Sequence, residues 1–322
     1  MRLKRTIALL TVFVLAVSCT LALSSCNQKK TYNVGICQLV THDALDAATQ
    51  GFQDALKKEL GEENVTFDLQ NAAGDSNTCA TIVNSFVSKN YDLIMANATP
   101  ALQAAANATT TIPVLGTSIT EYGVALSIKD FSGTVGTNVS GTSDLAPLSD
   151  QAQMLLDVFP NAKNVGLLYC SAEANSEYQV AVVENYLKEK DVVVTRYSFA
   201  DSNDVAQVTE KAAAACDVIY IPTDNTAASC ADAINNVCLP KKVPVVAGEE
   251  GIAAKCGAIT LSISYYNIGE KTGQMAAKIL KGESKIEEMA IEYDANPVKK
   301  YNKEICEQLG VTVPSDYTAI GE

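Results

Sequence analysis

The sequence predicts an α/β protein of two similar lobes, each a parallel sheet flanked by helices, joined by a three-crossover hinge. Short apolar runs alternate with amphipathic helical segments along nearly the whole chain. This alternation occurs in two similar halves, and a segment rich in Gly, Ser and Thr (residues 134–145) lies between them. These three observations predict the fold class.

Nine apolar runs have the length and the β-branched composition of buried strands. Helical patterns lie between most of them, as in residues 43–60, where Leu45, Phe52 and Leu56 recur at helical spacing. Strands that alternate with helices in this way form parallel sheets with helices on both faces. The expected strands are Val34–Gln38, Val65–Gln70, Asp92–Ala98, Ile112–Gly116, Val165–Cys170, Val192–Phe199, Val218–Pro222, Val243–Ala247 and Ala258–Ile263.

One strand–helix–strand unit in each half aligns with the other. The segment 92–100 corresponds without a gap to 217–225, which places Thr99 opposite Asp224. We interpret the two halves as similar lobes; the alternative is that any two α/β units look alike. We expect the first lobe over residues 32–140 plus about 265–288 and the second over 145–262 plus about 294–322, with the first crossover in 134–145.

The first 25 residues have the pattern of an export signal, because three basic residues precede an apolar run from Thr6 to Leu23. The run ends in Leu-Ser-Ser-Cys26, which resembles a bacterial lipobox. An uncleaved helical anchor or cleavage elsewhere are the alternatives. We expect residues 1–25 to be a lipoprotein signal peptide and residues 26–31 a tether. The protein would then be extracytoplasmic, held at the bacterial cell membrane by lipid on Cys26.

The composition excludes several classes of function. Loss of the three basic residues of the signal would take the formal charge from −13 to −16, and such acidity argues against nucleic acid and anionic membrane surfaces as partners. The single histidine and the lack of any Cys-x-x-Cys pair among ten cysteines argue against a metal site. We expect no metal, no cofactor, free thiols and a monomer.

Ligands of open parallel sheets bind beyond the carboxyl ends of the strands, where the following helices begin. The residues at these positions are therefore the candidate ligand-binding residues. In the first half they are Gln38, Leu39, His42, Thr99, Pro100, Thr117 and Ser118. In the second half they are Glu173, Asn175, Ser176, Thr223, Asp224, Asn225 and Glu249.

The two sets differ in charge, which predicts a ligand with two unlike ends. Thr99 followed by Pro100 has the pattern of an N-cap residue followed by proline at the first helical position, and the free N–H groups of such a turn favour an anion. The second set carries Glu173, Asp224 and Glu249 with no basic residue. A free α-amino acid fits, with its carboxylate at Thr99 and its ammonium at Asp224 or Glu249. The alternative for each acidic residue is a helix cap.

Six segments in the same order along the chain resemble the substrate-binding proteins of the TrpX type, which are lipoprotein components of ABC importers. They are Gln38–Asp46, Gln70–Asp75, Ala98–Pro100, Gly141–Leu145, Glu173–Ser176 and Pro222–Thr226. The resemblance implies a type I periplasmic-binding-protein fold and an aromatic or other apolar amino acid as ligand. It also implies permease subunits with a cytoplasmic ATPase as partners, and a pocket lined by the Glu-x-Asn-Ser and Thr-Asp-Asn positions.

Three other functions are the alternatives to an importer component. The same fold binds sugars or nucleosides in other proteins, and a sensory module that presents its ligand to a receptor would have the same sequence features. An enzyme is disfavoured, because the chain has no Walker loop, no Gly-x-Ser-x-Gly and no second histidine. With no tryptophan in the chain, stacking on an aromatic ligand would fall to Tyr122, Tyr178 or Tyr265.

Overall fold

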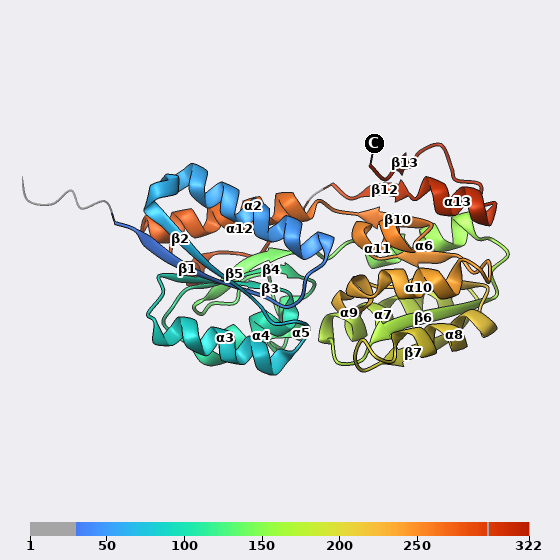
Figure 1. The fold of residues 1–322 in the computed structure, drawn as a ribbon, viewed down its shortest axis with the longest axis horizontal. Helices are drawn as coiled ribbons and strands as arrows, with labels where there is room; N and C mark the ends of the chain where they lie inside the picture. Colours follow the sequence, from blue (N-terminus) through green and yellow to red (C-terminus); the bar gives the residue numbers. More distant parts are fainter. Residues whose placement is uncertain (1–29, 295, 322) are drawn as a thin grey trace, which may run out of the picture. The chain divides into compact units, whose positions relative to one another are not determined.

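The computed structural model describes residues 30–294 and 296–321. The expected signal peptide, Cys26 and most of the tether lie outside these residues. Within them, no helix is both long enough and apolar enough to cross a membrane. Residues 32–322 form one unit that contains two sheets of mostly parallel strands flanked by helices, which confirms the predicted fold class (Figure 1).

The first sheet is entirely parallel, with strand order β11-β5-β4-β3-β1-β2. Its apolar centre is β3, in which every residue is buried. The strands are β1 (Tyr32–Gln38), β2 (Val65–Asn71), β3 (Leu93–Asn97), β4 (Val114–Ile119), β5 (Val139–Ser143) and β11 (Glu292–Tyr293).

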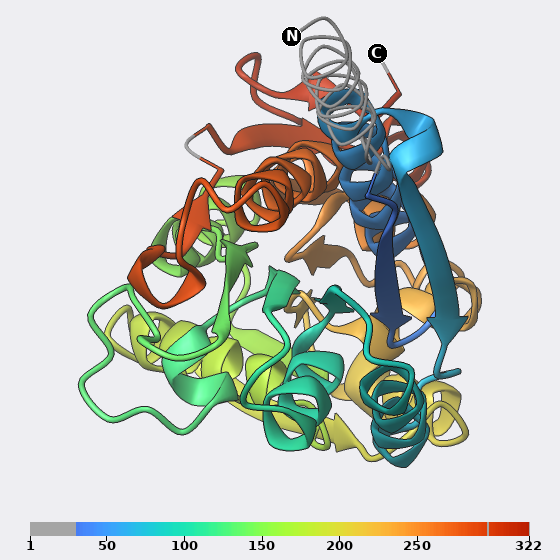
Figure 2. The same ribbon diagram turned by 90° about the vertical axis from the view of Figure 1, so that its left-hand side faces the viewer.

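Helices cover both faces of the first sheet. Figure 1 shows α2 (Asp43–Leu60) and α12 (Tyr265–Leu280) on one face, and α3 (Ser76–Ser88), α4 (Thr99–Ala108) and α5 (Tyr122–Ala125) on the other. Both views show α2 and α12 side by side (Figure 2). Glycine allows this approach, since a Cβ on Gly269 would lie 2.0 Å from the carbonyl oxygen of Ala48.

The second sheet has strand order β13-β12-β10-β9-β8-β6-β7, and only the β10–β12 pair is antiparallel. Its strands are β6 (Asn164–Cys170), β7 (Val193–Phe199), β8 (Val218–Ile221), β9 (Val245–Ala247), β10 (Ile259–Ser262), β12 (Val298–Tyr301) and β13 (Thr318–Ala319). One face packs against α8 (Val205–Ala215), α9 (Asn225–Ser229), α10 (Ala231–Cys238) and α11 (Glu250–Lys255). The other packs against α6 (Leu148–Val158), α7 (Ala174–Lys188) and α13 (Lys303–Leu309).

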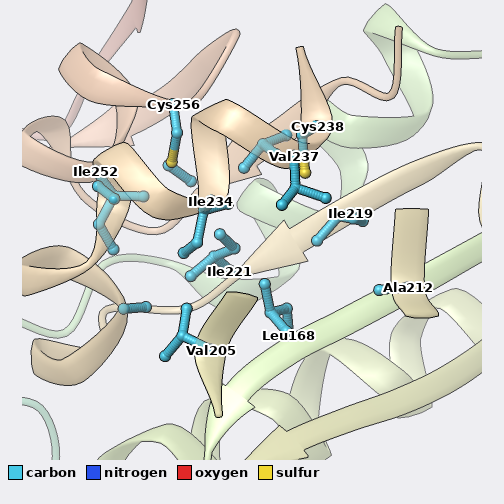
Figure 3. Close-up of a cluster of buried hydrophobic side chains, with 14 of the residues drawn as sticks. Leu168, Val205, Ala212, Ile219, Ile221, Ile234, Val237, Cys238, Ile252 and Cys256 are labelled. Atoms are coloured by element: carbon cyan, nitrogen blue, oxygen red, sulfur yellow. The ribbon is translucent and has the colours of Figure 1, made fainter. Parts of the chain in front are cut away.

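The cysteines serve as small apolar side chains. The eight cysteines from Cys37 to Cys306 are free thiols, and six of them are buried. Figure 3 shows Cys238 and Cys256 within the cluster formed by Ile234, Val237 and Ile252. A buried thiol packs as a small hydrophobic group, so these residues need no disulfide to account for their positions.

The chain passes between the two sheets three times, through 144–147, through 263–264 and between β11 and β12. The prediction of a crossover over 134–145 is wrong for residues 139–143, which form β5. The polar side chains of β5 are buried and hydrogen-bonded. The Thr142 hydroxyl lies 2.8 Å from the hydroxyl of Thr272, and the Ser140 hydroxyl donates to the Met289 carbonyl. Hydroxyls satisfied in this way allow a strand without the usual apolar pattern.

Candidate functional site

The predicted site residues lie at the carboxyl ends of the strands of both sheets, and most of them are buried. Two of the fourteen, Pro100 and Thr223, are half-buried. The two lobes meet directly at one of these positions, where His42 Nε2 lies 3.2 Å from Asn225 Oδ1. The space between the lobes is the interlobe cleft. The buried members are Gln38, Leu39, His42, Thr99, Thr117, Ser118, Glu173, Asn175, Ser176, Asp224, Asn225 and Glu249.

Glu173 organises the half of the cleft that belongs to the second lobe. One of its carboxylate oxygens accepts from the backbone N–H and the hydroxyl of Thr226, at 2.9 and 2.8 Å. The other accepts from the backbone N–H and the amide of Asn225, and from the amide of Asn175. This carboxylate therefore caps the first turn of α9 and orients two amide side chains of the site.

Asp224 is the N-cap of the same helix, with Oδ1 accepting from the backbone N–H of Ala227 at 2.7 Å. Its Oδ2 accepts from the backbone N–H of Cys170 at 2.6 Å and from the hydroxyl of Ser176 at 2.7 Å. Burial, followed by the neighbouring Glu173 carboxylate, raises the pKa of Asp224 to about 7. Both oxygens of this residue thus have partners within its own lobe.

Glu249 is the N-cap of α11, and its two oxygens accept from the backbone N–H groups of Gly251 and Ile252. Burial raises the pKa of Glu249 to about 7. All three acidic residues predicted for the second lobe therefore serve as helix caps, which is the alternative that the sequence left open for each of them.

Hydrogen bonds fix the tautomer of His42. The Asn225 amide donates to Glu173 at 2.6 Å, so the Asn225 carbonyl oxygen faces the imidazole. Nε2 of His42 must then carry the proton, which leaves Nδ1 as an acceptor in the neutral ring. Burial lowers the pKa of His42 and so favours that neutral form.

The first lobe contributes two strained turns. Ala98 has φ 89° and Ser118 has φ 56°, and both are non-glycine residues in left-handed conformation directly beyond or at the end of neighbouring strands. The prediction of Thr99 as an N-cap is wrong: α4 begins at Thr99 and Ala98 occupies the cap. Such strain concentrates at functional sites, where the surrounding structure enforces it.

Four buried polar atoms around the cleft have no hydrogen-bond partner among the described residues. They are His42 Nδ1, Ser118 Oγ, Asn175 Oδ1 and Asp144 Oδ1. Buried polar atoms without partners are rare in native proteins and call for an explanation at each site. Two of the atoms belong to the first lobe, one to the second lobe and one to the first crossover.

Asp144 was missed in the sequence, although it follows β5 directly. It lies in the first crossover, and its Oδ2 accepts from the Tyr265 hydroxyl at 3.0 Å. Tyr265 begins α12, immediately after the second crossover. Burial raises the pKa of Asp144 to about 6. Recognising β5 as a strand would have drawn attention to this residue through the same strand-end rule.

The aromatic candidates differ in position. Tyr122 belongs to the core of the first lobe, where its hydroxyl donates to the carbonyls of Gly116 and Thr142. Tyr178 is half-buried on α7, and Tyr265 is buried at the junction of the lobes. No group of three metal-ligating side chains occurs within residues 30–294 and 296–321.

Two cavities contact both lobes at the edges of the cleft. One, of about 300 Å³, is lined by residues that include Leu39, Pro100 and Glu173. The other, of about 510 Å³, is lined by residues that include Glu249 and Tyr265. The cleft thus extends from the loops after β1 and β3 to the crossovers.

Residues 33–319 match the family model of the ABC transporter substrate binding protein. The chain belongs to this family. This substrate-binding protein is 36% identical over 260 residues to a tyrosine-binding protein of Clostridioides difficile strain R20291, across 80% of this chain and 75% of that protein. The likeness confirms the resemblance seen in the sequence.

Two solved structures illustrate how this substrate-binding protein compares with its relatives. An ABC domain from Streptococcus pneumonia in complex with L-Trp is 30% identical, with a TM-score of 0.84 over 89% of this chain and 97% of that one. The ligand-free, open structure of a substrate-binding protein with adhesive properties from Clostridium difficile is 36% identical, with a TM-score of 0.68 over 90% and 99%. The overall structural similarity is therefore higher to the complex with L-Trp than to the ligand-free, open structure.

Proposed function

We propose that this substrate-binding protein holds a free aromatic amino acid in the interlobe cleft and delivers it to an ABC permease driven by a cytoplasmic ATPase, without catalysing a reaction. The observation that carries the proposal is the set of unpartnered buried atoms described above, which belong to residues of both lobes and of the first crossover. A ligand that pairs with them would be enclosed by the two lobes together.

The chemistry of the cleft favours an amino acid. His42 Nδ1, Asn175 Oδ1 and Asp144 Oδ1 are acceptors, which suits an ammonium group and polar hydrogens. The first turn of α4 offers backbone N–H groups to a carboxylate. The ligands named for the two relatives, tyrosine and L-Trp, are of the same class.

A thermal-shift screen tests this proposal. The purified protein is melted with each of the twenty amino acids, with nucleosides and with sugars. We expect tyrosine or tryptophan to raise the melting temperature by several degrees, because a ligand at a hundredfold excess over Kd adds about 2.7 kcal/mol of stability. Shifts produced only by nucleosides or sugars would contradict the amino-acid proposal and favour the other ligand classes of this fold.

Turnover and uptake complete the test. Recovery of the bound amino acid unchanged is expected, and its chemical conversion would contradict a purely binding role. Loss of uptake in cells lacking the protein is expected if it serves an importer. Normal uptake would favour the sensory alternative.

We propose further that the mature protein is extracytoplasmic and anchored by lipid on Cys26. We expect Cys26→Ser to release the protein from the membrane fraction or to leave it as the unprocessed precursor, because the lipid attachment site is lost. Fractionation and gel mobility measure this result. Cys19→Ser is the matched control within the signal and should stay anchored; unchanged anchoring of Cys26→Ser would contradict the proposal.

A further inference from the structure

The carboxylates around the cleft differ in how many of their oxygens have partners. Glu173 accepts five hydrogen bonds, Asp224 accepts three and Glu249 accepts two, with both oxygens of each engaged inside the second lobe. These bonds satisfy the N-termini of α9 and α11. Asp144 differs, because only its Oδ2 is engaged and Oδ1 has no partner among residues 30–294 and 296–321.

The position of Asp144 suits a ligand that both lobes must enclose. It is 3% exposed and lies on the crossover between β5 and α6. The Tyr265 hydroxyl holds the carboxylate from the second crossover. Burial and then Asp144 raise the pKa of Tyr265, so this hydroxyl remains a protonated donor.

We propose that Asp144 Oδ1 is the acceptor of the ligand ammonium group and that Tyr265 is its positioning residue. An ammonium ion desolvated in the cleft needs a charged acceptor. His42 is neutral and Asn175 is an amide, so neither supplies one. This assignment rests on the proposed function and replaces Asp224 and Glu249, the candidates from the sequence.

A calorimetric cycle of protein and ligand tests the assignment. Tyrosine and tryptophan are titrated into the wild-type protein and Asp144→Asn, alongside 3-(4-hydroxyphenyl)propanoate and indole-3-propanoate, which lack the amino group. We expect Asp144→Asn to weaken amino-acid binding about 10- to 150-fold, the range for a lost charged hydrogen bond. The same substitution should leave binding of the desamino acids nearly unchanged.

Asparagine retains an oxygen that can accept from Tyr265, so the fold should survive. Should Asp144→Asn fail to fold, Tyr265→Phe carries the same test, with a smaller loss that is again confined to the amino acids. Asp150→Asn is the matched control, because Asp150 is exposed on α6, six residues away. It should bind all four ligands as the wild type does.

The outcomes separate this assignment from the proposed function. Equal losses for amino acids and desamino acids in Asp144→Asn would overturn the assignment of the ammonium to Asp144 and leave the function standing. The assignment to Asp144 would also be overturned if Asp224→Asn, and not Asp144→Asn, weakened binding of the amino acids more than binding of the desamino acids. Failure of both amino acids to bind the wild-type protein would overturn the proposed function and the assignment together.

Discussion

Replacing Glu173 by alanine is expected to lower the free energy of unfolding by about 2–4 kcal/mol. The substitution removes the acceptor of five hydrogen bonds and leaves the N–H groups of Asn225 and Thr226 unpaired in a buried site. Relief of the repulsion with Asp224 offsets part of this loss. Urea unfolding followed by circular dichroism measures the change.

The control for this prediction is Glu189→Ala, at the exposed C-terminal end of α7. A surface substitution of this kind should change stability by less than about 0.5 kcal/mol. The Glu173 variant should also bind ligand more weakly, since Asn225 would no longer be held against His42. Equal stability of the two variants would show that Glu173 does not organise the N-terminus of α9.

The ligand-free protein is expected to lose stability as the pH rises from about 4 to about 7. Burial raises the pKa of Asp144 to about 6, and those of Asp224 and Glu249 to about 7. In the unfolded chain such groups titrate near pH 4. Across this window the unfolded state binds fewer protons than the folded state, so deprotonation favours unfolding. A single such group contributes on the order of 3–4 kcal/mol.

Other carboxylates act in the opposite direction at lower pH. Hydrogen bonds from Tyr91 and Gln70 lower the pKa of Asp68 to about 2, so its contribution to stability is lost on acidification below about pH 4. The stability maximum should therefore lie near pH 4–5. Urea midpoints at pH 4.5, 6 and 7.5 measure the trend, and Glu249→Gln should flatten it. A stability that rises between pH 4.5 and 7.5 would contradict the prediction.

Periodicity predicted most of the fold, because buried strands and amphipathic helices leave a clear pattern. All nine expected strands occur, and the helix expected over 43–60 has the bounds of α2. β5 escaped notice because its sequence, Val-Ser-Gly-Thr-Ser, lacks the apolar run of a buried strand. Its polar side chains are satisfied by residues far away in the sequence, such as Thr272 and Met289.

The positions of the candidate residues at the strand ends were predictable from the sequence, and the partners of their side chains were not. The strand-end rule pointed to the loops that surround the cleft. Whether an acidic residue such as Glu249 caps a helix or meets a ligand depends on where its oxygens point, which spacing does not determine. Asp144 was missed for the reason that β5 was missed.

The unpartnered atoms of the cleft also affect how often the ligand-free protein would activate the transporter. In an open protein, water hydrates His42, Ser118, Asn175 and Asp144, whereas closure without ligand strips that water away. Each buried atom left unpaired costs about 1–3 kcal/mol. A combined penalty of even 4 kcal/mol would keep the empty closed form near one molecule in a thousand. A permease that recognises closure would thus seldom hydrolyse ATP for an empty binding protein.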